Sequence, residues 1–369
     1  MTPKLKRAVA IALYGLVVLV AFEGFCRLAL SSEWLLWKIG TEDDSSWRLR
    51  WVNRPHDNSQ IFYSFDIYHP LRGWAVQPGV HAMPVFSHKI LNTNSRGLRG
   101  EREYEYQKPA GTRRILAVGD SFTFGDQVSD NETYVSLVEQ LLPQTEVLNL
   151  GVHGYGHDQM LIYLREEGLR YRPDIVLIGF LRTDMLRNLV RFRDFAKPQF
   201  TLTNGQLALL NSPVPRPESV LNAEFSRLKG LDLLAITYAR ARSLLGLRYR
   251  EAEELTVSIL DEMLRSIRAA GATPIFAFFP ERPDVTLAPE DKSPGESFLL
   301  AFCATRGVRC LSMRPAFHAE TDRLESLFTG SHWSAAGHQI AAQQLRTYLL
   351  QNGFAPDGAL EHPQSHPHD

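Results

Sequence analysis

Ser121 stands where a nucleophile is expected in an α/β protein, directly after a short apolar strand. The strand is predicted for residues 113–119, where "RRILAVG" is an apolar run that ends on turn residues. In an open parallel sheet, ligands bind just beyond the carboxyl ends of the strands. A serine hydroxyl is a weak nucleophile until a base removes its proton, so the hypothesis needs a histidine at the same edge.

His332 is the candidate base. It lies in "FTGSHWSAAGH", just before the last predicted helix and therefore at the same edge of the sheet. We expect Trp333 to fix this loop and Ser334 to cap the helix. Backbone N–H groups at Ser121 and in the glycine-rich segment 151–156 are candidates to hold a developing oxyanion, because glycine lets the backbone approach a substrate closely. These groups together predict nucleophilic attack on a carbonyl.

Alternating strands and helices must position these groups. Strands are predicted at residues 113–119, 146–151, 174–180, 273–279 and 308–313. Helices are predicted at about 129–142, 159–169, 251–271, 296–305 and 334–350. This alternation predicts a parallel sheet that is covered by helices on both faces.

The first thirty residues differ from the rest of the chain because they are mostly apolar. A basic tip, "KLKR", precedes an apolar run from Ala8 to Leu30, which is long enough to span a bilayer if Glu23 and Arg27 pair at i and i+4. We expect an uncleaved signal anchor, and the basic tip predicts a cytoplasmic N-terminus. The body of the chain is then extracytoplasmic, and periplasmic in a Gram-negative cell.

A cleaved signal peptide and a lipoprotein are the alternatives to an anchor. A cleaved signal peptide needs a small-x-small site, and "AFEGFC" gives a poor one. A lipoprotein needs small residues before Cys26, but Phe25 precedes it. Trp34 and Trp37 follow the apolar run, as aromatic anchors at a membrane interface do.

The organisation predicted from these patterns has four parts. Residues 1–30 form the anchor, and residues 31–109 form an irregular juxtamembrane lead-in of short extended pieces and turns. Residues 110–352 form the α/β domain, with an insertion at about 190–250. The polar tail at 353–369 is predicted to be disordered.

Net charge and cysteine content argue against nucleic acid binding and against a disulfide-based fold. The formal net charge of -1 gives no basic field, so nucleic acid is not an expected partner. Three cysteines are too few for a disulfide scaffold. Cys303 and Cys310 either form one disulfide or serve as small buried hydrophobic residues, and both alternatives remain open.

Four segments, "GDSFTFG", "NLGVHGYG", "TDMLRN" and "HWSAAGH", occur in the order of the four sequence blocks of SGNH/GDSL hydrolases. The chain resembles this family from about residue 113 to 350. The lead-in "LNTNSRGLRG" resembles that of membrane-anchored bacterial members. The resemblance implies a flavodoxin-like three-layer α/β/α sandwich, preceded here by a transmembrane helix. It also implies ester hydrolysis or acyl transfer without a metal or other cofactor.

The resemblance carries roles onto particular residues. Ser121 matches the nucleophile and the first oxyanion donor, Gly154 matches the second donor, and His332 matches the general base. In the third block the family has Asn where this chain has Thr183, whose hydroxyl donates over a shorter reach. In the last block it has Asp where this chain has Thr329.

The second departure leaves the orientation of the imidazole open. Thr329 itself, a backbone carbonyl, Asp322 and Glu325 are the alternatives. Supporting roles are expected for Asp120, Asp184 and Asn188, which shape the loops around the site.

Two further histidines flank the glycine loop. His153 and His157 are expected to be exposed to solvent, and lining the cleft is the alternative.

We therefore expect a membrane-anchored extracytoplasmic serine esterase or acyl hydrolase that forms an acyl-enzyme with an ester or an acylated glycan or lipid. Two alternatives remain open. One is an O-acyltransferase that acetylates a cell-surface or secreted polysaccharide. The other is a catalytically degenerate protein that binds a glycan or lipid. No oligomeric state is predicted.

Overall fold

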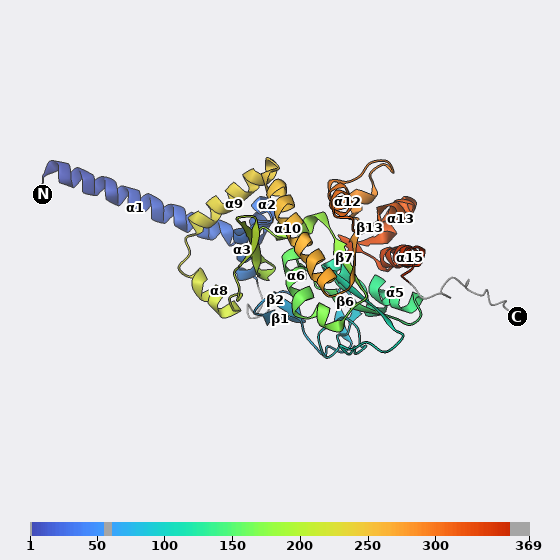
Figure 1. The fold of residues 1–369 in the computed structure, drawn as a ribbon. Helices are drawn as coiled ribbons and strands as arrows, with labels where there is room; N and C mark the ends of the chain where they lie inside the picture. Colours follow the sequence, from blue (N-terminus) through green and yellow to red (C-terminus); the bar gives the residue numbers. More distant parts are fainter. Residues whose placement is uncertain (1, 55–60, 355–369) are drawn as a thin grey trace. The chain divides into compact units, whose positions relative to one another are not determined.

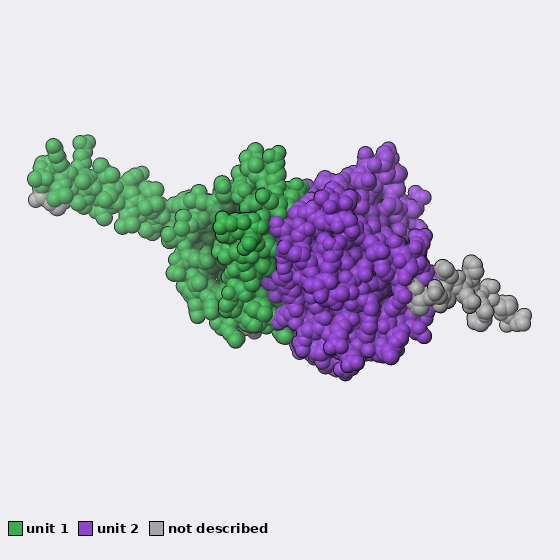
Figure 2. Space-filling view, in the orientation of Figure 1, with its two compact units in different colours: residues 1–74, 189–254 green, residues 75–188, 255–369 purple. Residues whose placement is uncertain are grey.

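The computed structural model describes residues 2–54 and 61–354 (Figure 1). The chain divides into two compact units (Figure 2). Unit 1 comprises residues 1–74 and 189–254, and unit 2 comprises residues 75–188 and 255–369. The predicted disordered tail lies outside the described residues beyond residue 354.

Unit 2 is built on a parallel sheet of five strands. The strands are β5 (Arg113–Gly119), β6 (Thr145–Gly151), β7 (Ile175–Phe180), β12 (Thr273–Phe278) and β13 (Arg309–Ser312). Their spatial order is β13-β12-β7-β5-β6. Read from the β6 edge this is the flavodoxin-like order 2-1-3-4-5, whose ligand sites lie where the order reverses beside the first strand. The predicted parallel sheet is confirmed.

Helices cover both faces of this sheet, which gives three α/β/α layers. One layer contains α5 (Tyr134–Leu141) and α15 (Ala335–Gln351), whose apolar faces share one core with alternate residues of β5. The other contains α6 (His157–Glu166), α12 (Pro294–Arg306) and the part of α10 (Leu247–Ala269) that belongs to unit 2. Figure 1 shows α6 and α10 side by side, and Arg165 Nε donates to Ser266 Oγ between them at 2.9 Å.

Shorter elements complete unit 2. Those outside the site are β3 (Met83–Val85), β4 (Lys89–Leu91), α11 (Arg282–Val285), α13 (Arg314–His318) and α14 (Leu324–Leu327). Strand β2 (Gly73–Val76) runs across the boundary between the units. All three cysteines of the chain are free, so Cys303 and Cys310 are not bridged here.

The helix predicted to open at Ser129 begins later. Residues Asp130–Glu132 form a 3-10 turn, and α5 starts at Tyr134 with Thr133 as its N-cap. The Ser129 hydroxyl accepts the N–H of Ile90 at 3.1 Å, because the lead-in packs against this turn.

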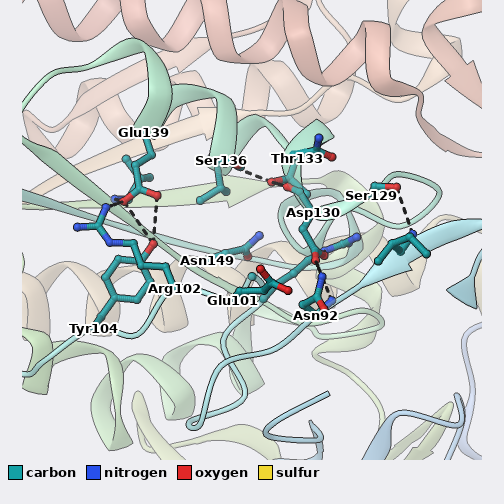
Figure 3. A pocket seen from close by; sticks show the side chains of 16 residues that line it. Asn92, Glu101, Arg102, Tyr104, Ser129, Asp130, Thr133, Ser136, Glu139 and Asn149 are labelled. Atoms are coloured by element: carbon teal, nitrogen blue, oxygen red, sulfur yellow. Dashed lines mark hydrogen bonds and ion pairs between the residues drawn. The ribbon is translucent and has the colours of Figure 1, made fainter. Parts of the chain in front are cut away.

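The lead-in and α5 enclose a polar cavity of about 300 Å³ (Figure 3). Arg102 and Tyr104 from the lead-in both contact the Glu139 carboxylate, the arginine at 2.7 Å. Asn92 donates its side-chain amide to Asp130 at 2.8 Å. These polar contacts around the cavity therefore attach the lead-in to the domain.

Unit 1 combines the N-terminal segment with the predicted insertion. Its helices are α1 (Pro3–Leu30), α2 (Glu33–Ile39), α3 (Asp44–Val52), α8 (Pro217–Glu224) and α9 (Lys229–Leu244). Its strands are β1 (Asp66–His69), β8 (Phe192–Arg193), β9 (Phe195–Ala196), β10 (Gln199–Thr203) and β11 (Gln206–Leu210). Helices α2 and α3 lie in the stretch expected to be irregular. Helix α1 is long and apolar enough to cross a membrane.

Candidate active site

Ser121 begins the short helix α4 (Ser121–Phe124), which lies against the carboxyl ends of β5 and β6. Two glycines make this position possible. A Cβ on Gly119 would lie 2.1 Å from Thr123 Oγ1, and one on Gly151 would lie 2.1 Å from the Phe124 nitrogen. A larger residue at either strand end would push α4 away from the sheet, which explains why β5 ends on a glycine directly before the Asp-Ser pair.

The structure brings Ser121 and His332 together. His332 Nε2 lies 2.9 Å from Ser121 Oγ, which is hydrogen-bonding distance. The Ser121 side chain is buried, and that of His332 is 23% exposed. The base is therefore within reach of the hydroxyl proton and still open to a substrate.

A hairpin of β14 (Phe328–Thr329) and β15 (His332–Trp333) presents the imidazole. Trp333 is fully buried and donates its indole N–H to the Pro280 carbonyl at 3.0 Å. Its ring meets that of Phe122 edge-on at 5.1 Å. Burial of one residue of the strand thus fixes its neighbour, His332.

The two nitrogens of His332 have different surroundings. Nδ1 lies 3.3 Å from Ser331 Oγ. Nε2, the nitrogen that faces Ser121, also lies 3.8 Å from Asp126 Oδ2. Thr329 is exposed and is the backbone partner of His332 across the hairpin.

The sequence also suggests Asp322 and Glu325 as carboxylates that could orient the ring. Glu325 forms an ion pair with Arg282, and Asp322 is exposed. Sequence reasoning missed Asp126 because the family pattern places the carboxylate beside the histidine in the chain. A signal existed, since Asp126 closes the same "GDSFTFGD" segment that carries the nucleophile. The Asp126 N–H donates to the Ser121 carbonyl at 3.0 Å, so the turn after α4 returns to its own start.

Arg99, a residue of the lead-in, stabilises the turn after α4. Its guanidinium donates to the carbonyls of Phe124 at 2.8 Å, Gly125 at 2.6 Å and Val128 at 2.6 Å. Its Nε contacts Asp130 at 2.7 Å. Burial lowers the pKa of the Arg99 guanidinium, and the charges of the neighbouring carboxylates, Asp130 first, oppose this.

Arg99 belongs to the "LNTNSRGLRG" lead-in, so this motif positions the segment that follows the nucleophile. Gly125, which has a φ of 94°, allows the sharp turn.

A second buried arginine links three of the site loops. Arg187 Nη1 lies 2.6 Å from Asp184 Oδ1 and 3.2 Å from Asp120 Oδ2, and it donates to the Tyr155 carbonyl at 2.9 Å. Asp120 Oδ1 in turn accepts the N–H of Phe122 at 3.0 Å and caps α4. The Ser121 hydroxyl lies 3.2 Å from Asp120 Oδ2, so its single proton has a second acceptor besides His332.

Besides the Ser121 N–H, the expected oxyanion donors come from the loops after β6 and β7. Gly154 is buried with a φ of 72°, a conformation that favours glycine. Thr183 lies half-buried in the first turn of α7 (Arg182–Arg187). Asn188 follows that helix, donates to Thr256 Oγ1 at 2.9 Å and accepts the N–H of Asp158 at 3.2 Å. It thereby ties the third loop to the start of α6.

The expectation that His153 and His157 are exposed is wrong. Both are buried, because the loop after β6 packs beneath α4 and the end of β7. The rings of His153 and Phe124 lie 6.1 Å apart, and those of His157 and Phe180 lie 5.0 Å apart. Burial lowers the pKa of His157 to about 3, so this imidazole is neutral near pH 7.

These groups suit acyl transfer through a serine. They provide a hydroxyl with a base in contact, a buried carboxylate near that base, and glycine-lined backbone at the carboxyl edge of the sheet.

A comparison with protein families identifies one family for this chain. A model of the GDSL-like lipase/acylhydrolase family matches residues 117–340. Comparison with curated proteins found no match.

Similar solved structures include a catalytic mutant of an acetylxylan esterase from Geobacillus stearothermophilus. It is 17% identical, with a TM-score of 0.39, over 67% of this chain and 97% of that one. A psychrotrophic esterase from Pseudoalteromonas sp. is 13% identical, with a TM-score of 0.39, over 65% and 97%. A lipase/acylhydrolase from Enterococcus faecalis is 16% identical, with a TM-score of 0.37, over 65% and 97%.

Proposed function

The chain belongs to the GDSL-like lipase/acylhydrolase family of ester hydrolases, and from this premise we propose that it is a membrane-anchored serine esterase with Ser121 as nucleophile and His332 as base. The observation that supports this most is the 2.9 Å contact between His332 Nε2 and Ser121 Oγ. A nucleophile and a base in contact are the minimal unit of serine acyl transfer.

The proposed reaction has two halves. Ser121 Oγ bonds to the ester carbonyl carbon while its proton passes to His332 Nε2. The N–H groups of Ser121 and Gly154 and the Thr183 hydroxyl would bind the oxyanion. The tetrahedral intermediate breaks its bond to the alkoxy oxygen, and the alcohol leaves with the proton from His332. Water then attacks the acyl-enzyme by the same steps and releases the acid.

Asp126 supports the charge that this cycle creates. The imidazolium is positive in both tetrahedral intermediates, and the Asp126 carboxylate 3.8 Å away favours that charge. Ser331 Oγ, 3.3 Å from Nδ1, orients the ring. In this proposal Asp126 stabilises the imidazolium charge and Ser331 orients the ring, whereas an aspartate at position 329 would do both.

The membrane anchor is the second part of the proposal. Helix α1 has 28 residues and an 18-residue window of mean hydropathy 2.3. At 1.5 Å per residue such a helix is about 42 Å long, against a hydrocarbon core of about 30 Å. Lys4, Lys6 and Arg7 precede the apolar run and favour a cytoplasmic N-terminus with an extracytoplasmic domain. A signal sequence would pass the same test of length, so the mass of the mature N-terminus in the membrane fraction decides between the two.

Turnover of short p-nitrophenyl esters by the full chain in lipid nanodiscs tests the esterase. We expect Ser121→Ala to remove turnover and Ser326→Ala, an exposed serine outside the site, to retain it. Equal turnover by wild type and Ser121→Ala would refute the assignment of the nucleophile. A folded wild type without turnover on any ester would favour the degenerate binding protein.

An O-acyltransferase remains the alternative, because it would use the same acyl-enzyme beside the membrane. In that case a sugar hydroxyl, not water, attacks the acylated Ser121. Adding an acceptor polysaccharide to the assay separates the two functions. An esterase releases the acid at an unchanged rate, whereas a transferase moves the acyl group onto the polysaccharide.

A further inference from the structure

Helix α9 of unit 1 carries its apolar residues on the outside. Leu231, Leu234, Tyr238 and Leu245 recur at helical spacing on one side of the segment and are 62%, 60%, 65% and 72% exposed. A surface helix of a soluble domain normally turns such a stripe towards the core. Large contiguous apolar patches on a surface mark a contact with a partner or a membrane.

Buried ion pairs on the opposite side fix this orientation. Asp232 of α9 pairs with Arg48 of α3, whose guanidinium also pairs with Glu224 of α8. Lys229, at the start of α9, pairs with the same Glu224. The Arg48 side chain is 6% exposed. Turning the leucines inward would leave these charges unpaired or in water, so the outward apolar face is a built feature of unit 1.

The loop before α9 extends the apolar surface. Phe225 is 85% exposed and Leu228 is 55% exposed. We define the α9 patch as Phe225 and Leu228 together with the four exposed residues of the stripe. Arg227 is exposed in the same loop and provides positive charge. Such a combination of apolar and basic residues is typical of helices that lie in a membrane interface.

Helix α1 sets the position of the patch. The Glu23 carboxylate of α1 accepts the N–H groups of Lys229 and Gly230, both at 2.9 Å. Arg27 of α1 donates to the Arg227 carbonyl at 2.9 Å. Figure 1 shows α9 beginning beside the C-terminal part of α1. The start of α9 is therefore bound to residues that lie before the end of the apolar helix.

We propose that the α9 patch is immersed in the outer interface of the bilayer that α1 spans, so that lipid acyl chains cover it. Arg27 and Glu23 precede Leu30 by three and seven residues, which places the start of α9 about 5 to 10 Å below the end of α1. An interfacial helix buries its apolar face to this depth. The inference depends on the proposed anchor, and it gives unit 1 two attachments to the membrane.

Spin labels on the full chain in phosphatidylcholine–phosphatidylglycerol nanodiscs test this, in a variant with the native cysteines replaced. Leu234→Cys and Leu245→Cys report on the patch. Leu16→Cys, in the middle of α1, reports on the anchor, and Gln206→Cys, an exposed residue of β11, is the aqueous control. For each label we measure the ratio of its collision rate with oxygen to that with a water-soluble nickel chelate. We expect this ratio to be several-fold higher at 234 and 245 than at 206.

The outcomes distinguish failure of the proposed immersion of the α9 patch from failure of the proposed α1 anchor. A label at 16 in lipid with labels at 234 and 245 in water would overturn the inference and leave the anchor standing. A label at 16 in water would refute the anchor and the inference with it. Dipolar coupling between labels at 234 of two chains would assign the patch to a second copy and also overturn the inference.

A second measurement keeps the native cysteines. A benzophenone amino acid at position 234 should form a lipid adduct on illumination, and one at 206 should not. Because both positions are in unit 1, hydrolysis of a soluble ester should stay at the wild-type rate in each variant. Equal lipid adducts at the two positions would contradict the proposed immersion.

Discussion

Replacing Asp126 by asparagine tests the electrostatic part of the proposed mechanism. The substitution keeps the size of a buried side chain and removes its charge. Asp126 Oδ2 lies 3.8 Å from His332 Nε2, so the carboxylate attracts the imidazolium that forms in each half of the reaction. The neutral imidazole of the resting enzyme gains little from it, so the loss falls on the transition state.

The distance sets the magnitude. Two unit charges at about 4 Å attract by about 4 kcal/mol at an effective dielectric constant of 20 and by about 1 kcal/mol in bulk water. Asp126 is buried, but the His332 side chain is 23% exposed and Arg99 partly neutralises the carboxylate. An intermediate loss of about 3 kcal/mol corresponds to about a 10²-fold fall in kcat/KM.

The assay is a pH profile of kcat/KM for a soluble p-nitrophenyl ester, measured for wild type and Asp126→Asn. Besides the fall in rate, we expect the acidic limb to move to lower pH, since the imidazolium loses its partner. Ser331→Ala should cost less, about fivefold, because a neutral hydrogen bond contributes about 1 kcal/mol.

A second substitution distinguishes the loss of the carboxylate charge from a structural disruption of the site. Thr329 faces His332 across the hairpin, so Thr329→Asp returns a carboxylate to the ring in the Asp126→Asn background. We expect it to recover at least part of the lost rate. An Asp126→Asn variant with wild-type kcat/KM and an unmoved acidic limb would refute the role of Asp126.

Three further predictions concern the supports of the site. Gly151→Ala should lower kcat by about 10²-fold, because its Cβ would lie 2.1 Å from the Phe124 nitrogen and must displace α4; wild-type kcat would contradict this. Trp333→Phe should lower the free energy of unfolding by about 1 to 3 kcal/mol in urea titrations, since the buried Pro280 carbonyl loses its donor; an unchanged midpoint would contradict this. Glu281 follows Pro280 in the chain and is the N-cap of α11; burial, with the charge of Asp284, raises its pKa to about 7, so its stabilising proton is present at low pH and lost as the pH rises through about 7. The fall in Tm between pH 5 and pH 8 should therefore be smaller in Glu281→Gln than in wild type, and equal falls would contradict the assignment.

Much of unit 2 could be predicted from the sequence because its signals are local. Each strand is a short apolar run that ends on turn residues, and each helix carries its own periodicity. The meeting of Ser121 and His332 follows from this alternation, since both residues come after the carboxyl ends of strands. The contact at 2.9 Å agrees with that expectation.

The supporting groups could not be predicted in the same way. Arg99 and Arg187 act through carbonyls and carboxylates of loops that only the folded chain brings together. Asp126 reaches His332 because a glycine with positive φ turns the chain back after α4. The amphipathic stripe of α9 was missed because its segment carries buried charges on the opposite side.

Covalent labelling tests the central claim most directly. The full chain in nanodiscs is treated with a fluorophosphonate and digested, and the adduct is located by mass spectrometry. We predict a single adduct on Ser121 that forms in wild type and is lost in His332→Ala, because the hydroxyl reacts only when a base takes its proton. An adduct on another serine, or none on a folded wild type, would contradict the account.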